Sequence, residues 1–152
     1  MDVAKIGLGC VTFGREISET ESFQLLDYAF EKGINFLDTA SAYGDGNSEK
    51  IIGKWLAKNP VAASTATIAS KILPPYSPEK IHEVVEESLN RLQVSSLDLF
   101  YLHNRDASAA CPETLQTLDQ LVGEGKIQSL GVSNHLQSAR SRISHRETPG
   151  ES

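Results

Sequence analysis

Apolar and polar positions alternate along the chain in a way that predicts strands and helices in turn. The strand candidates are five apolar runs at residues 4–13, 34–40, 66–72, 97–103 and 127–134. Between them, apolar residues recur every three or four positions, which is the spacing of one helical face. The helix candidates cover about residues 18–32, 48–58, 77–92 and 112–124. This strict alternation is typical of a parallel sheet with crossover helices.

Local signals mark where two of the predicted helices begin. Ser18 and Glu21 have the spacing of a capping box, and Gly33 is placed to end the same helix. Ser77 is a suitable N-cap before Pro78, whose missing N–H costs nothing at the first helical position. We therefore expect one helix to begin after Ser18 and another to begin after Ser77.

The strand–helix repeat predicts one α/β domain over residues 1–134. Each unit takes about 30 residues, near the repeat of a (β/α)8 barrel, and a doubly wound sheet is the other fold with this order. The run LDLFYLH at residues 97–103 is apolar nearly throughout. Such continuity favours a strand that is covered on both faces.

The pattern changes at residues 135–152, HLQSARSRISHRETPGES. Serine and arginine dominate this segment, and its apolar positions form only a weak helical stripe. The composition is typical of a divergent, disordered tail. The interpretation that we favour is that the reading frame leaves the domain near Asn134, so that the domain is truncated.

Composition and charge narrow the classes of function. A net charge of −6 and a pI near 5.2 disfavour nucleic acid as the main ligand. Two cysteines, Cys10 and Cys111, are too few for a disulfide framework and have no metal-ligand spacing. The longest apolar runs are a few residues, and the N-terminus lacks the features of a signal peptide. We expect a soluble cytoplasmic protein that binds no metal, nucleic acid or membrane.

Polar side chains that can carry chemistry end four of the predicted strands. Because the carboxyl ends of parallel strands meet at one edge of a sheet, we expect these side chains to converge there. Tyr43, in the loop after the second strand, belongs to the same edge. The strand-end residues are Asp38, Lys71 and His103, followed by Ser133 and Asn134 after the fifth strand.

This combination indicates proton transfer to a carbonyl oxygen. A free tyrosine, with a pKa near 10, is a poor acid at neutral pH, and a neighbouring ammonium held by a carboxylate would make it a better one. A histidine beside it could orient the carbonyl. Reduction would also need a hydride from a cofactor, because no side chain supplies one. A Schiff-base enzyme using Lys71 and a proton-transfer isomerase remain alternatives. The stretch GLGCVTFG is not the dinucleotide fingerprint.

Five segments carry a family pattern: IGLGCVTFG (6–14), GINFLDTASAYGDGNSEKIIGKWL (33–56), IASK (68–71), SLNRLQVSSLDLFYLH (88–103) and LVGEGKIQSLGVSN (121–134). Over about residues 5–134 they resemble the aldo-keto reductase family, and the second and fourth segments are highly specific. The resemblance implies a (β/α)8 TIM barrel that reduces aldehydes or ketones with NADPH, with NAD as the alternative cofactor.

The same resemblance assigns roles to residues of this chain. Tyr43 would be the general acid, Lys71 would tune it, Asp38 would anchor Lys71, and His103 would position the substrate carbonyl. Ser133 and Asn134 resemble the pair that binds the nicotinamide carboxamide. Thr12 and Asp38 would lie near the cofactor, and Asn104 would line the substrate pocket.

The chain departs from the family pattern in its number of strands. The family barrel has eight strands, whereas five are predicted here, so we expect a partial barrel of about the first five βα units. The later segments that bind the pyrophosphate and 2′-phosphate have no counterpart. Two strand edges would be unpaired, and self-association through them could follow. A non-catalytic interaction module is therefore the alternative function.

Overall fold

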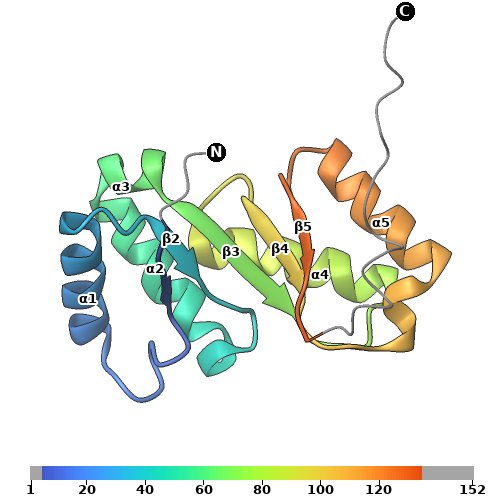
Figure 1. Cartoon of the computed structure of the whole chain (residues 1–152), viewed down its shortest axis with the longest axis horizontal. Coiled ribbons are helices and arrows are strands. Elements are labelled where there is room, and N and C mark those ends of the chain that lie inside the picture. The colour runs from blue at the N-terminus through green and yellow to red at the C-terminus, as the bar shows by residue number, and fades with distance from the viewer. Residues whose placement is uncertain (1–4, 135–152) are drawn as a thin grey trace, which may run out of the picture.

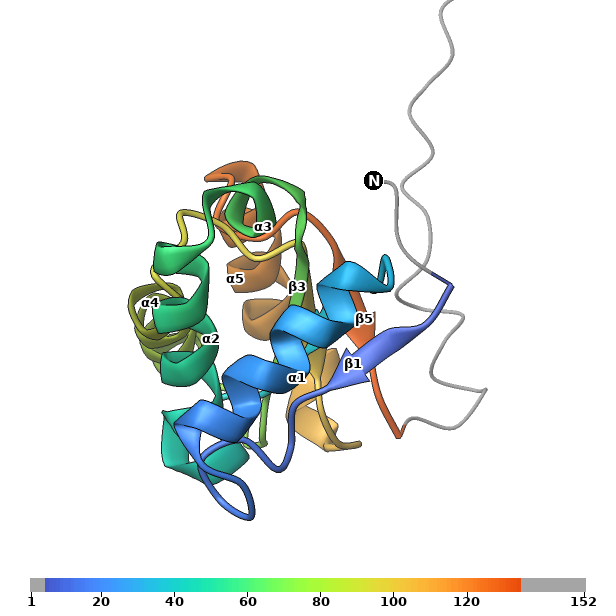
Figure 2. The same ribbon diagram turned by 90° about the vertical axis from the view of Figure 1, so that its left-hand side faces the viewer.

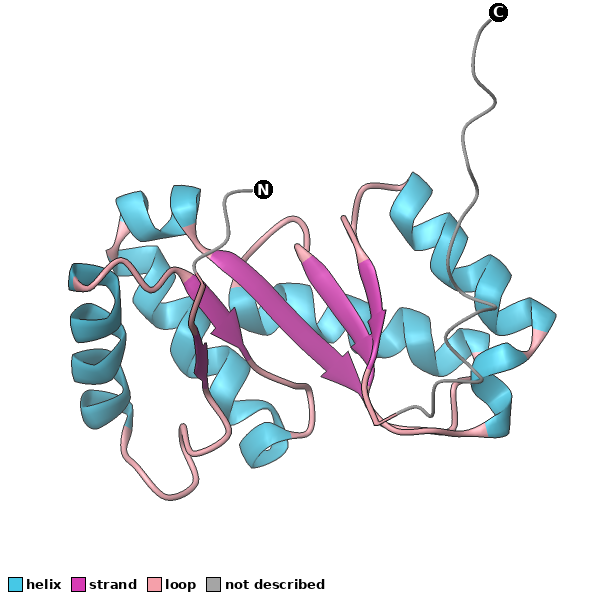
Figure 3. Cartoon of the chain, viewed as in Figure 1, coloured by secondary structure: helices cyan, strands magenta, loops and turns pink. Residues whose placement is uncertain are grey.

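A parallel sheet of five strands forms the centre of the computed structural model, which describes residues 5–134 (Figures 1 and 3). The strands lie in sequence order across the sheet, and every neighbouring pair is parallel. They are β1 (Gly7–Gly9), β2 (Phe36–Asp38), β3 (Thr67–Ile72), β4 (Leu99–Leu102) and β5 (Leu130–Val132). The predicted segment 135–152 lies outside the described residues.

The helices lie on one face of this sheet, and the opposite face carries none within the described residues (Figures 1 and 2). The α-helices are α1 (Glu19–Glu31), α2 (Asn47–Lys58), α3 (Pro60–Thr65), α4 (Pro78–Leu92) and α5 (Pro112–Gly123). Two short 3-10 helices, η1 (Tyr43–Gly46) and η2 (Ala107–Ala110), follow β2 and β4. Because all five strands run in the same direction, their carboxyl ends lie at the same edge of the sheet.

The predicted helix starts are confirmed. The hydroxyl of Ser18 accepts the N–H of Glu21 at 3.2 Å, and the Glu21 carboxylate accepts the N–H of Ser18 at 2.8 Å. This reciprocal pair is a capping box at the start of α1. Ser77 caps α4 by accepting the N–H of Lys80, and Pro78 is its first residue. Both signals are local, which is why they could be identified without the fold.

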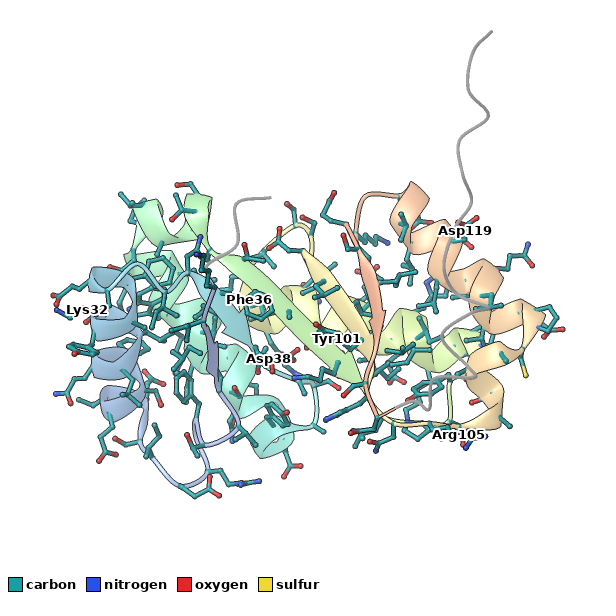
Figure 4. All side chains as sticks on the ribbon, in the orientation of Figure 1. Lys32, Phe36, Asp38, Tyr101, Arg105 and Asp119 are labelled. Carbon is teal, nitrogen blue, oxygen red and sulfur yellow. The ribbon has the colours of Figure 1, made fainter. Side chains whose placement is uncertain are left out.

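The two faces of the sheet differ in burial. On the helix-covered face Leu37, Ile72 and Phe100 are fully buried. On the open face Phe36 and Tyr101 are only partly buried, and Figure 4 shows them in front of the strands. The prediction that the fourth strand is covered on both faces is therefore wrong for the described residues. β4 alternates between partly buried and buried positions because only one of its faces meets helices.

Some predicted details are also wrong. α3 and the two 3-10 helices were not expected, and the strands are shorter than the apolar runs. The apolar spacing of residues 112–124 predicts that Leu115 is buried together with Leu118 and Leu121, yet Leu115 is 38% exposed. It lies on an apolar groove between α5 and β5, which Leu118, Leu130 and Val132 also line. Periodicity placed Leu115 on the correct face of α5 but could not show that this part of the face lacks a neighbour.

A buried carboxylate joins α2 to β3 and α4 on the covered face. The side chain of Glu49 is fully buried, and its Oε1 accepts the hydroxyl of Ser70 at 2.6 Å. Arg91 Nη1, at the end of α4, contacts Glu49 Oε2 at 3.2 Å. The helices approach closely here, since a Cβ on Gly53 would lie 2.2 Å from the Arg91 carbonyl oxygen. The carboxylate is thus satisfied by partners from two neighbouring elements.

No helix in the described part of the chain is long and apolar enough to cross a membrane.

Candidate active site

Asp38 and Lys71 meet on the open face at the carboxyl edge of the sheet. Asp38 is in register with Ala69, so Lys71 lies two residues further along β3 and points to the same face. Lys71 Nζ lies 2.8 Å from Asp38 Oδ1. Figure 4 shows Asp38 at the end of β2, on the face away from the helices. The predicted ion pair between neighbouring strand ends is therefore present.

The Lys71 ammonium has two further oxygen partners. It donates to the Thr39 carbonyl oxygen at 2.8 Å and lies 3.4 Å from the Tyr43 hydroxyl. It also lies 4.9 Å from the centre of the Tyr43 ring. The Lys71 side chain is only 7% exposed. A nearly buried cation with three oxygen neighbours is held in one place, which suits a group that acts through its charge.

A tight turn brings Tyr43 to this edge. The segment Tyr43–Gly46 connects β2 to α2, and Gly44 and Gly46 adopt φ values of 56° and 84°. Glycine adopts this region without steric cost, and Asp45 between them, with φ 53°, is one of the residue types that tolerate it, so the sequence YGDG permits the sharp return. Ser41 ties the start of the turn to β3, because its N–H and its hydroxyl both donate to the Lys71 carbonyl oxygen.

His103 follows β4 and faces Tyr43. The two rings pack edge to face, with centroids 6.0 Å apart. The His103 N–H donates to the Ile72 carbonyl oxygen at 3.0 Å, which extends the β3–β4 ladder to this residue. Burial lowers the pKa of His103, the Lys71 charge lowers it further, and Asp38 acts in the opposite direction. We therefore expect a neutral imidazole near pH 7, with one N–H to donate.

One ring nitrogen of His103 lacks a hydrogen-bond partner within the described part of the chain. Its Nδ1 is buried and makes no hydrogen bond to any described residue. Most buried side-chain nitrogens are paired, so an unpaired one at the edge of the sheet is unusual. The ring orientation is consequently set by packing and by the position of its backbone rather than by a bond at Nδ1.

Asn104 and Asn134 form a second polar cluster beside His103. Asn134 Nδ2 donates to the His103 carbonyl oxygen at 3.1 Å and to Asn104 Oδ1 at 3.2 Å. Ser133 precedes Asn134, and its N–H donates to the Leu102 carbonyl oxygen at 2.9 Å. The predicted cofactor and substrate residues at the ends of β4 and β5 are thus adjacent to each other.

Thr12 is less closely connected to the other predicted residues. It lies in the turn after β1, where its carbonyl oxygen accepts the N–H groups of Arg15, Glu16 and Ile17. This turn reaches the site through Cys10, whose N–H donates to the Asp38 carbonyl oxygen at 2.9 Å. The structure thus gives Thr12 a role in shaping the turn, and a contact with a cofactor remains a prediction.

Two neighbouring titratable groups are held neutral by their surroundings. Burial and the nearby Asp38 charge raise the pKa of the Cys10 thiol to about 12. The same two causes raise the pKa of Tyr101. Neither is a candidate nucleophile or acid at neutral pH. Among the described residues, no group of three or more His, Cys, Asp or Glu side chains is arranged to hold a metal.

Sequence reasoning missed Tyr76, which does not end a strand but contacts Asn104 beside the candidate site. Tyr76, between β3 and α4, is fully buried, and its hydroxyl contacts both the N–H and the carbonyl oxygen of Asn104. The only sequence signal is an aromatic residue after Pro74 and Pro75, just before the helix cap. That pattern does not reveal a partner 28 residues away.

Comparison with known proteins agrees with this architecture. The family model described as "Aldo/keto reductase family" matches residues 5–149, which extends past the boundary predicted at residue 134. The chain is 36% identical over 144 residues to "Probable aldo-keto reductase 1" of Glycine max, covering 87% of this chain and 42% of that protein.

Two solved structures have the same fold. An aldo-keto reductase from Bacillus halodurans, in its holo form, superposes with a TM-score of 0.81 at 30% identity, over 92% of this chain and 49% of that one. An aldo-keto reductase from Klebsiella pneumoniae in complex with NADPH superposes with a TM-score of 0.78 at 31% identity, over 90% of this chain and 47% of that one. The chain thus spans about half the length of these relatives, and its five-stranded sheet corresponds to about half of their (β/α)8 barrel. The family match over most of its length shows that this chain belongs to the aldo/keto reductase family.

Proposed function

We propose that this chain carries the proton-donating half of an NADP(H)-dependent carbonyl reduction site. The observation that carries the proposal is the contact series Asp38–Lys71–Tyr43–His103 at one edge of the sheet. Family membership supports an oxidoreductase, and the relative from Klebsiella pneumoniae binds NADPH. The substrate class is then an aldehyde or ketone.

The proposed proton transfer runs from Tyr43 to the carbonyl oxygen. As negative charge develops on that oxygen, the Tyr43 hydroxyl donates its proton, and the phenolate that remains lies beside the Lys71 ammonium. Asp38 keeps Lys71 in place at 2.8 Å. The neutral His103 ring can donate a hydrogen bond to the same oxygen and orient it. Each group therefore has a role that its contacts already favour.

The cofactor, when bound, supplies the hydride that reaches the carbonyl carbon. Ser133 and Asn134 are the residues that would hold its carboxamide. The Asn134 amide nitrogen already donates to His103 and Asn104, so a carboxamide N–H would meet Asn134 at its oxygen. A Cβ on Gly9, which pairs with Asp38, would meet no atom within 4 Å, so space is open beside the ion pair.

The alternative with Lys71 as an imine-forming nucleophile receives less support. An amine nucleophile must be neutral, and a lysine is made neutral by an apolar site or by a second cation. Here the Lys71 nitrogen has a carboxylate, a carbonyl oxygen and a hydroxyl as neighbours. An ammonium can donate to all three of these partners, which fits the reductase better than a Schiff-base enzyme.

The proposal predicts that Tyr43→Phe removes turnover but keeps cofactor binding. NADPH binding is measured by fluorescence titration, and NADPH oxidation with 4-nitrobenzaldehyde is measured at 340 nm. We expect the oxidation rate to fall by about 10²- to 10⁴-fold, the usual contribution of a general acid. The dissociation constant should change little, because the lost hydroxyl acts on the substrate.

Tyr28→Phe is the matched control. Tyr28 is 61% exposed on α1, so the same loss of a hydroxyl should change neither the binding nor the rate. Equal turnover by wild type and Tyr43→Phe would refute Tyr43 as the acid. Absence of NADPH binding by the wild-type chain would refute the reductase proposal for this chain as a whole.

A further inference from the structure

Tyr76 is connected to the candidate site through its hydroxyl, although it lies on the segment between β3 and α4. Its hydroxyl donates to the Asn104 carbonyl oxygen at 2.5 Å and accepts the Asn104 N–H at 3.0 Å. Both backbone polar groups of one residue are thus held by one side chain. Asn104 directly follows His103, so this contact lies one residue away from the ring that faces Tyr43.

The backbone of Tyr76 is itself anchored by two hydroxyl groups. Its N–H donates to Ser108 Oγ at 2.9 Å, and its carbonyl oxygen accepts the hydroxyl of Thr114 at 2.6 Å. Ser108 belongs to η2 and Thr114 to the first turn of α5. Two elements after β4, η2 and α5, therefore hold the tyrosine, and the tyrosine in turn holds the backbone at the end of β4.

The position of this backbone matters for both polar clusters of the site. Because His103 Nδ1 has no hydrogen-bond partner among the described residues, its ring depends on the backbone on either side. On one side, the His103 N–H bonds to Ile72. On the other side, the Tyr76 hydroxyl holds Asn104. The Asn104 side chain then accepts from Asn134 at 3.2 Å, which carries the same constraint to β5.

We propose that Tyr76 is a positioning residue, whose hydroxyl fixes the His103–Asn104 backbone and so orients the His103 ring toward Tyr43. It touches neither a substrate nor a cofactor and acts only through Asn104. The importance of Tyr76 for function rests on the proposed role of His103. The contact between the Tyr76 hydroxyl and Asn104 does not depend on that role, and it can be tested without any catalytic measurement.

The first test follows the titration of His103 by NMR in Tyr76→Phe, with the His103 signal assigned through His103→Gln. The groups that face His103 are Lys71 on β3, Asp38 on β2 and Tyr43 on η1. In wild type, burial and Lys71 lower the pKa of His103. Loss of the Tyr76 hydroxyl should free this backbone and admit water to the ring, so the pKa should rise toward the ordinary value.

Thr114→Val is the matched control. It removes a hydrogen bond to Tyr76 at the carbonyl and leaves the hydroxyl contact with Asn104 in place. We expect a lower urea midpoint for both variants, but a changed His103 titration only for Tyr76→Phe. A His103 titration that is the same in Tyr76→Phe as in wild type would overturn the proposal, as would an equal change in Thr114→Val.

A second measurement uses the wild-type chain and does not depend on the variant folding. The Asn104 N–H should exchange with deuterium as slowly as the buried amides of β4, because Tyr76 Oη is its acceptor. Fast exchange would contradict the proposal. Should Tyr43→Phe leave turnover unchanged while both Tyr76 tests succeed, the proposed function fails and the positioning contact stands.

Discussion

Two ion pairs lie on opposite faces of β3. One contacts Ser70, and the other includes the next residue, Lys71. Ser70 points to the helix-covered face and bonds to Glu49, which pairs with Arg91. Lys71 points to the open face and pairs with Asp38. The side chains of the first pair are 0% and 23% exposed, and Lys71 and Asp38 are 7% and 36% exposed. The exposed fraction alone therefore does not distinguish the Glu49–Arg91 pair from the Asp38–Lys71 pair of the candidate site.

The difference lies in how completely the neighbouring polar atoms are bonded. Both Glu49 oxygens have partners, from β3 and from α4, and the side chain is fully buried, so the carboxylate is not open to a ligand. Around Lys71, by contrast, the Tyr43 hydroxyl is 3.4 Å away, and His103 Nδ1 has no partner in the described part of the chain. Polar atoms with unused hydrogen-bonding capacity at an open edge of the sheet, rather than charge alone, favour a functional site.

The largest effect on stability is expected for Arg91→Met. This variant leaves the fully buried Glu49 carboxylate without its cation, and an unpaired buried charge is strongly unfavourable. The guanidinium also packs on Gly46, since a Cβ there would lie 2.8 Å from Arg91 Cζ. We expect a loss of about 3 kcal/mol in the free energy of unfolding, measured by urea denaturation with circular dichroism.

Lys54→Met is the control for Arg91→Met. It breaks an ion pair that is shorter, 2.6 Å to Glu19 against 3.2 Å in the Glu49–Arg91 pair, but both of its side chains are about half exposed. A change of about 0.5 kcal/mol is expected, because water replaces the lost partner. Equal losses in the two variants would show that the covered pair has no special structural role.

Ser70→Ala should have a smaller effect on the same network. The alanine removes one hydrogen bond to Glu49 Oε1 and leaves the Arg91 contact at Oε2. A loss of about 1.5 kcal/mol is expected, since hydrogen bonds to charged groups are worth somewhat more than neutral ones. Combining it with Arg91→Met in a double-mutant cycle should give a non-additive result, because both partners share one carboxylate. Additive losses would contradict a connected network.

Much of the fold followed from local signals in the sequence. The caps at Ser18 and Ser77 act within one helical turn, so they could be found without any tertiary contact. The convergence of Asp38, Lys71 and His103 followed from the parallel topology alone, because strand ends share an edge. Chemistry that is carried by strand ends can be predicted once the alternation of strands and helices is clear.

The residues that sequence reasoning missed depend on long-range contacts. Tyr76 and Asn104 are 28 residues apart, and Glu49 and Arg91 are 42 apart. Neither pair has a periodic or capping pattern that would connect its members. Leu115 was misassigned for the related reason that periodicity identifies a helix face but not whether another element covers it. Such features required the relative placement of helices and strands.

A smaller effect on stability than that of Arg91→Met or Ser70→Ala is expected for Lys71→Met, although it removes the central cation of the candidate site. Methionine keeps most of the buried side-chain volume, and the remaining Asp38 carboxylate is 36% exposed and can be hydrated. We expect the free energy of unfolding to change by at most about 1 kcal/mol, because a charge at a wet edge does not need its partner as a buried one does. NADPH oxidation should nevertheless be lost. A stability loss as large as that of Arg91→Met would show that Lys71 mainly supports the fold, and would remove the distinction between the two faces of β3.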